Sequence, residues 1–137
     1  MEYLDLGRNQ ISVLDARAFD GLDHLAVLKL DDNRFSSVPS QSFSVVPQLI
    51  ELHLGSNGIQ SLESDVFRDL NRLSLLDLTG ASVYNVSELA FRGLRRLRVL
   101  KIGKNALDTL PALVNILFRV LISIFYEFRY YKRVKYM

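Results

Sequence analysis

The two histidines, His24 and His53, are the side chains best suited to acid–base catalysis or metal binding in this chain of 137 residues. They lie at unrelated positions of the sequence pattern, and no cluster of carboxylates converges on either of them. A metal site needs several ligands at one point, and a general base needs a partner that orients it. The chain also has no cysteine, which removes disulfides, thiolate ligands and a cysteine nucleophile. The sequence therefore predicts no enzyme activity, no metal site and no cofactor.

A single tripeptide, Asn85-Val86-Ser87, matches the acceptor pattern for N-glycosylation. This pattern fits an exposed loop of a secreted protein, because the glycan is bulky and must lie on the surface. Asn85 is therefore a candidate glycosylation site.

Apolar and asparagine side chains recur at a constant step of 24 residues, and this step indicates which elements position any surface site. A fixed period in this range is typical of a solenoid, in which each repeat buries its apolar face only against its neighbours. Alternating leucines predict a short strand with one buried face in each repeat, and successive strands would pair in parallel through right-handed crossovers. The repeating columns are Leu4, Leu28, Leu52, Leu76 and Leu100, then Asn9, Asn33, Asn57 and Asn105, then Phe19, Phe43, Phe67 and Phe91.

Two stretches, 25–33 and 49–57, resemble the leucine-rich repeat, with Leu-x-x-Leu-x-Leu followed by asparagine. The length of 24 residues, with Ala18-Phe19 and Ala90-Phe91 in the back half, is similar to the subtype found in Toll-like receptors, Slit and chaoptin-like cell-surface proteins. The resemblance implies an α/β solenoid with a parallel sheet on its concave face and short helical turns or irregular chain on its convex side. It also implies a non-enzymatic module for protein recognition or cell adhesion in an extracellular receptor region, with an intracellular or membrane-attached scaffold or adaptor as the alternative.

The repeat divides the chain into five units and a tail. We expect repeats at 1–24, 25–48, 49–72, 73–96 and 97–111, the last of them incomplete. Ala81 replaces the asparagine of the fourth repeat, and a turn group left unpaired there would cost about 1–3 kcal/mol. The first residues lack the basic start and apolar run of a secretory signal, and the family's cysteine-rich end caps are missing. We therefore expect the chain to be part of a longer protein.

The outward positions of the strands form columns on the concave face, and two interpretations of them stay open. One is cross-strand pairing of Asp5 with Lys29 and of Asp77 with Lys101, which would contribute at most about 1 kcal/mol per pair. The other is a protein-binding footprint with an apolar centre and a charged surround. The residues of this predicted footprint are Ile50, Glu51, His53, Leu75, Asp77, Val99 and Lys101.

Residues 112–137 are apolar and aromatic with a basic end, and Pro111 is well placed to begin a helix over about 111–131. Three interpretations remain: a membrane span, a helix that packs on the fifth repeat, or sequence foreign to the fold. This segment also holds five basic side chains against Glu127, so the remaining residues carry a net charge of −2 although the whole chain carries +2. The basic pI therefore does not argue for nucleic-acid binding, and we predict a protein partner with no nucleic acid. The oligomeric state is left open.

Overall fold

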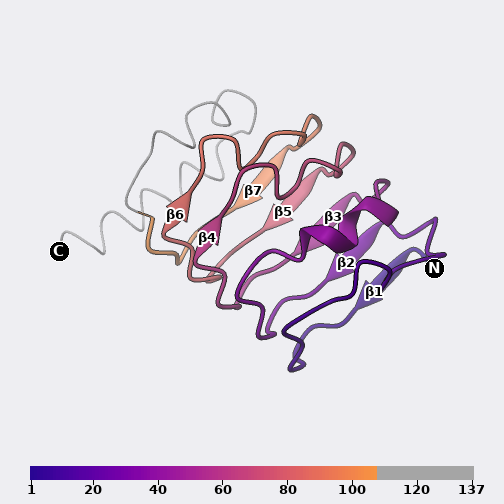
Figure 1. The fold of residues 1–137 in the computed structure, drawn as a ribbon, viewed down its shortest axis with the longest axis horizontal. Coiled ribbons are helices and arrows are strands. Elements are labelled where there is room, and N and C mark those ends of the chain that lie inside the picture. Colours follow the sequence, from indigo (N-terminus) through magenta and orange to yellow (C-terminus); the bar gives the residue numbers. More distant parts are fainter. Residues whose placement is uncertain (108–137) are drawn as a thin grey trace.

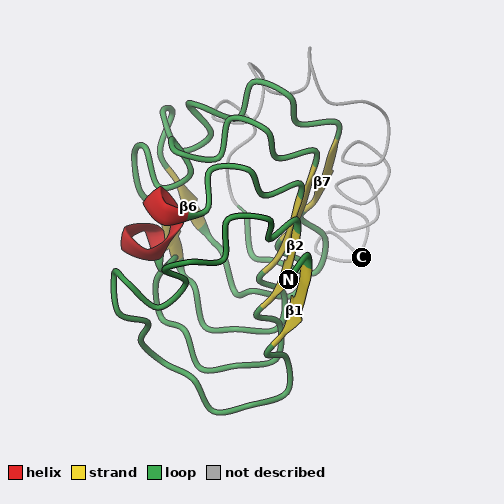
Figure 2. Cartoon of the chain, turned by 90° about the vertical axis from the view of Figure 1, so that its right-hand side faces the viewer, coloured by secondary structure: helices red, strands yellow, loops and turns green. Residues whose placement is uncertain are grey.

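The computed structural model describes residues 1–107, which wind as a solenoid of about four turns. Five parallel strands form the main sheet in the order β1-β2-β3-β5-β7. A second sheet pairs β4 with β6 on the opposite side of the coil, next to a single 3-10 helix, η1 (Figures 1 and 2). The bounds are β1 Tyr3–Asp5, β2 Val27–Lys29, η1 Ser40–Val45, β3 Glu51–His53, β4 Ser61–Leu62, β5 Leu75–Asp77, β6 Asn85–Val86 and β7 Val99–Lys101.

The register of the main sheet follows the 24-residue step predicted from the sequence. Leu28 pairs with Leu4 on one side and with Leu52 on the other, and Leu76 pairs with Leu52 and Leu100. Each strand has only three residues, so the central leucine points into the coil while its two neighbours face outward. The predicted α/β solenoid with a parallel sheet is confirmed.

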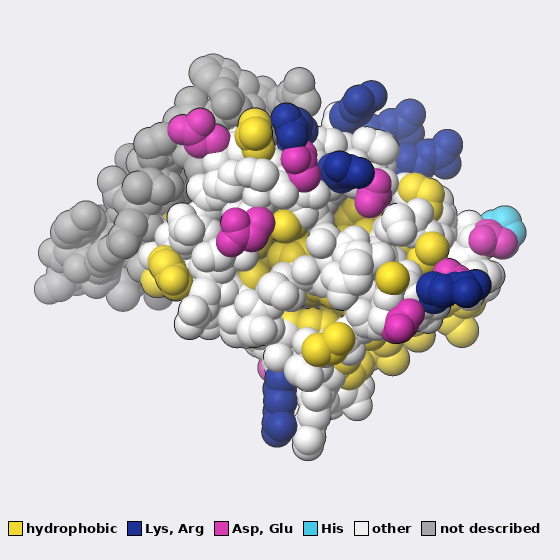
Figure 3. Space-filling view, in the orientation of Figure 1, with side chains coloured by type: hydrophobic (Ala, Val, Ile, Leu, Met, Phe, Trp, Pro, Cys, Tyr) yellow, Lys and Arg dark blue, Asp and Glu magenta, His cyan; other side chains and the backbone are white. Residues whose placement is uncertain are grey.

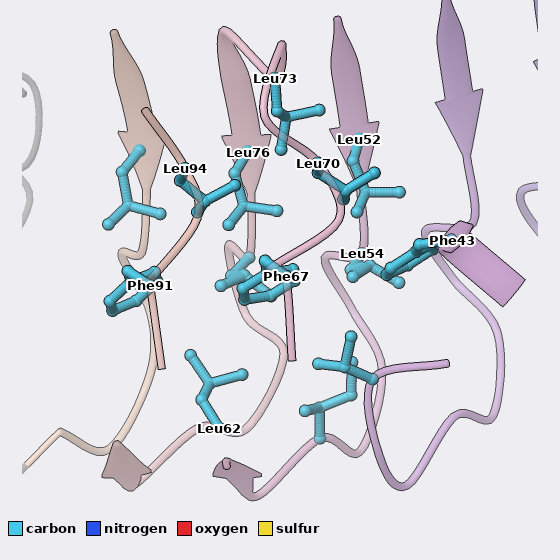
Figure 4. Close-up of a cluster of buried hydrophobic side chains, with 14 of the residues drawn as sticks. Phe43, Leu52, Leu54, Leu62, Phe67, Leu70, Leu73, Leu76, Phe91 and Leu94 are labelled. Carbon is cyan, nitrogen blue, oxygen red and sulfur yellow. The ribbon is translucent and has the colours of Figure 1, made fainter. Parts of the chain in front are cut away.

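The interior is filled by the columns of repeating apolar side chains. The four phenylalanines of the back column are all buried, and the rings of Phe67 and Phe91 stack with their centroids 6.1 Å apart and an interplanar angle of 12° (Figure 4). Met1 departs from the pattern, because its side chain is 67% exposed although the repeat places it at an interior position. No described coil lies on its N-terminal side, so nothing covers it.

The asparagine column closes the turn after each strand. The Asn57 side-chain amide donates to the carbonyls of Leu54 and Gly55 in its own turn and to Leu30 in the preceding coil, while its oxygen accepts from the Phe35 N–H at 3.1 Å. One buried side chain thus satisfies four backbone groups that stacking removes from water. Asn33 and Asn105 repeat the arrangement, so each of these three asparagines ties its own turn to the preceding coil.

The turn at Ala81 has no such ladder. In the other turns, the asparagine oxygen accepts a backbone N–H of the preceding coil. The N–H at the equivalent position here belongs to Ile59, which is fully buried and whose amide has no hydrogen-bond partner within the described chain. The backbone bends differently here, since Ser82 has a φ of 76° and its hydroxyl donates to the Asn57 carbonyl at 3.2 Å. The Ser82 hydroxyl therefore satisfies the Asn57 carbonyl, but the Ile59 amide stays without a partner.

The convex side of the coil consists of turns, the short strands β4 and β6 and the 3-10 helix η1, in agreement with the expected short helical turns or irregular chain. The segment after Ser87 forms a bend of consecutive turns, although the Ser87 hydroxyl does accept the Leu89 N–H at 3.2 Å, as a capping residue would. The helix expected over about 111–131, with its interpretation as a membrane span, lies outside the described residues. Within residues 1–107, no helix has the length and apolar character needed to cross a bilayer.

Candidate functional site

The predicted footprint forms a continuous surface on three neighbouring strands of the main sheet. The register pairs Glu51 with Leu75 and Leu75 with Val99 in one row. In the next outward row, His53 pairs with Asp77 and Asp77 with Lys101. Strands of one sheet lie about 4.8 Å apart, so each row brings its three side chains into contact range.

The apolar part of this surface lies beside β3 and β5. Ile50 directly precedes β3, and its side chain is 47% exposed. Leu75 and Val99 are half-buried between their neighbours on the sheet. Desolvation of such side chains by a partner stabilises a complex in proportion to the apolar area removed from water.

The charged part is a carboxylate–imidazole–carboxylate group centred on His53. The sequence-based expectation that no carboxylates converge on this histidine was therefore wrong, because the parallel register places Asp77 beside it and Glu51 lies two residues earlier on the same outward face. Its Nε2 lies 3.3 Å from an Oε2 of Glu51, and its Nδ1 lies 3.7 Å from an Oδ2 of Asp77. The nearby Asp77 carboxylate is the main influence on the pKa of His53, and with the hydrogen bond to Glu51 it outweighs partial burial and raises that pKa above its usual value of 6.5. The imidazole therefore takes up a proton more readily than in an open chain.

Asp77 is the partner most affected by this group. Its partial burial would raise its pKa, but the nearby His53 imidazole, hydrogen bonds from Thr79 and the charge of Lys101 together outweigh burial and lower the pKa to about 2. The Thr79 N–H donates to an Asp77 Oδ1 at 2.9 Å. Asp77 thus remains a carboxylate, held in a fixed orientation on the open face of the sheet.

The ion pairs proposed as the plainer interpretation of these columns are not formed. Within residues 1–107, neither Asp5 and Lys29 nor Asp77 and Lys101 come within ion-pair distance. Asp5 instead accepts the Gly7 N–H at 2.8 Å, which folds its side chain back along its own chain. Local turn bonding therefore competes successfully with cross-strand pairing.

The side chains of this surface offer charge, hydrogen bonds and apolar contacts. In the described part of the chain, no three His, Asp or Glu side chains come together as metal ligands. His53 and its two carboxylates offer charge and hydrogen bonds at the rim of an apolar strip. This combination matches the apolar centre and polar rim of protein interfaces.

Two further features lie away from the sheet face. Asn85, in β6, is exposed on the opposite side of the coil, and the hydroxyl of Ser87 lies 2.6 Å from that of Ser64. An arginine-lined hollow near Arg92, which the sequence reasoning missed, lies between the third and fourth coils. The run Arg92-Gly-Leu-Arg-Arg-Leu-Arg98 could have indicated it, because its two leucines are interior repeat positions and its arginines must therefore face outward.

The leucine-rich repeat profile matches residues 1–35 and 23–83, more than half of the chain. The chain belongs to the leucine-rich repeat family. Among curated protein sequences, none matches it. Proteins of this family and its Toll-like receptor relatives are generally not enzymes, and the family and fold together support a protein-interaction module.

Solved leucine-rich repeat structures resemble the chain over most of its length. The chain is 34% identical to the receptor in a TLR13–ssRNA13 complex, with a TM-score of 0.77. The matched region covers 80% of this chain and 16% of the receptor chain. For Toll of the Drosophila Toll–Spätzle complex, the identity is 26%, the TM-score 0.73 and the coverage 88% and 16%. For the leucine-rich repeat domain of APL1B, the identity is 25% and the TM-score 0.74, and the match covers 80% of this chain and 32% of that one. The chain therefore spans only a small part of each of these proteins, two of which are seen bound to a partner.

Proposed function

We propose that the chain is a non-enzymatic recognition module of an extracellular or cell-surface leucine-rich repeat region, and that it binds a protein partner through the open face of β3, β5 and β7. The observation that carries the proposal is the His53 group beside an apolar strip formed by the exposed Ile50 and the half-buried Leu75 and Val99, on a sheet whose register sets the order of these residues. Preorganised side chains bind with less loss of conformational entropy.

The size of the sheet favours a partner that also contacts neighbouring repeats. Five strands at about 4.8 Å spacing make a face only about 20 Å across. A standard interface uses about 20–30 residues of each partner, whereas each of the five strands of the main sheet has only three residues. The short share of the Toll-like receptor chains that this chain covers agrees with a larger recognition surface.

The binding surface can be tested with two substitutions of matched exposure. Ile50, at 47%, lies on the proposed face, and Leu89, at 45%, lies in the back turn after β6. The chain would be screened against individually displayed secreted and cell-surface ectodomains, and binding by any hit would be measured by surface plasmon resonance. We expect Ile50→Glu to weaken binding by at least about 10-fold, because a buried carboxylate is left without a partner. Leu89→Glu should change it less than about 2-fold, and a reversed pattern or the absence of any binder would contradict the proposal.

The extracellular placement rests on the family relatives and on Asn85. Expression of the chain behind a secretory leader in animal cells should give a species that shifts in mobility after treatment with an N-glycosidase. Asn85→Gln should abolish the shift, since the chain has no other acceptor sequence. A secreted, folded chain without the shift would remove this support and would favour the alternative of an intracellular scaffold or adaptor.

A further inference from the structure

The edge of the coil that leads into β5 and β7 carries six exposed arginines. Arg68 and Arg92 are 24 residues apart, as are Arg72 and Arg96, so each pair occupies equivalent positions in adjacent coils. Basic side chains gather over the loops at the upper edge of the molecule in Figure 3. We call this surface the arginine edge, and it comprises Arg68, Arg72, Arg92, Arg95, Arg96 and Arg98.

A hollow of about 550 Å³ opens beneath the arginine edge between two coils. Arg68, Arg92 and Arg95 contribute to its walls, and Asp65 and Asp69 line it as well. Its volume is in the range of small-ligand sites and exceeds what one sulfate or phosphate group needs. The hollow therefore has room for a charged group of a longer ligand.

Most of these arginines have no internal partner. Arg92 makes a two-bonded ion pair with Asp65, with both N–O distances at 2.6 Å. Within residues 1–107, the other five arginines form no ion pair or hydrogen bond through their guanidinium groups. Arg68 adds to the field at Asp65, whose pKa is lowered chiefly by the Arg92 hydrogen bond. One carboxylate is thus already neutralised, and the remaining guanidinium groups are available to bind anions in the two-bonded geometry they favour.

The first coil shows that the basic character belongs to one end of this edge. Asp20 occupies in the first coil the repeat position of Arg92, and Asp23 occupies that of Arg95. Residues 1–64 contain nine carboxylates and four basic side chains, whereas residues 65–107 contain four carboxylates and eight basic side chains. A polyanion would therefore be attracted to the C-terminal coils and repelled from the N-terminal ones.

From this placement, we propose that the arginine edge binds a sulfated polysaccharide of the heparin type, a function separate from protein recognition by the open sheet face. Single-stranded nucleic acid is less suited to the site, because such strands are held largely by stacking of bases on exposed aromatic side chains. The aromatic residue at this hollow, Phe91, is buried and stacked on Phe67. A sulfated chain needs only repeated anionic contacts, which the arginines supply.

Binding to immobilised heparin by the full 137-residue chain tests the proposal. The double variant Arg95→Ser/Arg96→Ser is compared with Arg17→Ser/Arg34→Ser, which removes the same charge from exposed positions of the first two coils. Because the basic residues of 112–137 are common to both variants, the comparison isolates the edge. We expect the first variant to raise Kd at least about 10-fold at physiological salt and to reduce the salt slope by about 1 per arginine removed. The second variant should change Kd less than about 2-fold.

A gain-of-affinity variant keeps the test decisive if the arginine variant does not fold. Asp69→Asn removes a carboxylate from the wall of the hollow and should tighten heparin binding. Equal losses in the two double variants, or undiminished binding of chemically desulfated heparin, would overturn the proposal. Stronger competition by a single-stranded oligonucleotide of equal charge would also overturn it, in favour of nucleic acid. None of these outcomes depends on whether the sheet face binds a protein.

Discussion

The first coil and the interior coils share a sequence pattern but not an environment. Leu4 and Leu6 are only partly buried, whereas Leu52 and Leu54, at the same repeat positions, are fully buried. The interior leucines have a coil on each side, and those of the first coil have one on a single side. In a solenoid, stability is a sum of contributions from each repeat and its nearest neighbours, so equal residues contribute unequally.

The same contrast appears in the turns, whereas the backbone conformation at equivalent glycines is shared. Asn9 donates only to Leu6 and Gly7 in its own turn, whereas Asn57 also spans to the preceding coil. Gly21 and Gly93 both have positive φ, at 81° and 100°. The contrast teaches that the effect of a substitution here depends on its coil as much as on its repeat position.

The largest difference is expected in the leucine column. We expect Leu52→Ala to lower the free energy of unfolding by about 2–5 kcal/mol, because it removes a fully buried side chain and leaves a cavity between two coils. Leu4→Ala should cost about 1 kcal/mol, because its side chain is already partly hydrated. Urea unfolding monitored by circular dichroism measures both values. Equal costs would mean that the first coil is covered as completely as the third.

The two glycines provide a second test. A Cβ at Gly93 would lie 2.5 Å from the backbone Cα and O atoms of Arg68, whereas a Cβ at Gly21 would meet nothing within 4 Å. We expect Gly93→Ala to cost at least about 3 kcal/mol, since the backbone of the neighbouring coil must move. Gly21→Ala should cost only about 1 kcal/mol, from the strain of positive φ. Thermal unfolding would show both, and a tolerated Gly93→Ala would contradict the close packing of these coils.

The asparagine column should give an intermediate difference. Asn57→Ala leaves the buried Phe35 N–H and the Leu54 carbonyl without their partner, whereas the other two carbonyls that it contacts keep a second donor, so we expect a loss of about 1–3 kcal/mol. Asn9→Ala breaks two exposed bonds and should stay within about 0.5 kcal/mol. Denaturant titration of the two variants side by side is the measurement. A larger loss at Asn9 than at Asn57 would show that the ladder is not what stabilises these turns.

The smallest effect is a dependence of stability on pH at the sheet face. Asp77 has a pKa lowered from 3.8 to about 2, so its contribution is present above pH 4 and is lost as pH falls towards 2. His53 has a raised pKa, so its contribution is complete below pH 6.5 and declines as pH rises through its higher folded value. We expect about 1 kcal/mol on each side, after allowing for solvent screening.

The variant His53→Gln separates these contributions. It should abolish the decline in unfolding free energy above pH 6.5, because no imidazole remains to titrate. It should reduce, but not abolish, the loss of unfolding free energy between pH 4 and 2, because Asp77 keeps its bonds to Thr79. The measurement is the free energy of urea unfolding across pH 2–9. An unchanged profile in the variant would show that His53 and Asp77 are not coupled.

Sequence reasoning succeeded where every repeat obeys the same rule. The Leu28–Leu52–Leu76 register and the burial of Phe67 follow from the 24-residue step, because one geometry places all equivalent side chains. It was less successful where a side chain has more than one possible hydrogen-bond or ion-pair partner. Pairing of Asp5 with Lys29 was one of the two interpretations left open, and Asp5 binds its own turn instead. Spacing alone cannot decide between a local backbone N–H and a neighbouring strand.

The candidate site shows the same limit. The sequence placed His53 beside Asp77 on the sheet, and the structure agrees with that register. The contact of His53 with Glu51, two residues earlier on the same strand, depends on rotamers that the register does not specify. The arginine edge was missed because net charge was assigned to the tail as a whole rather than followed along one edge of the coil.

By itself, the sequence determined that this chain coils, which side chains face inward, and how the strands align, because a 24-residue period leaves one way to stack apolar faces. Only the tertiary structure decided how completely each coil is covered, which carboxylate His53 meets, and that Arg68, Arg92 and Arg95 share one hollow. These features depend on distances between side chains of different coils. Such distances arise only when the coils are stacked, and no period in the sequence encodes them.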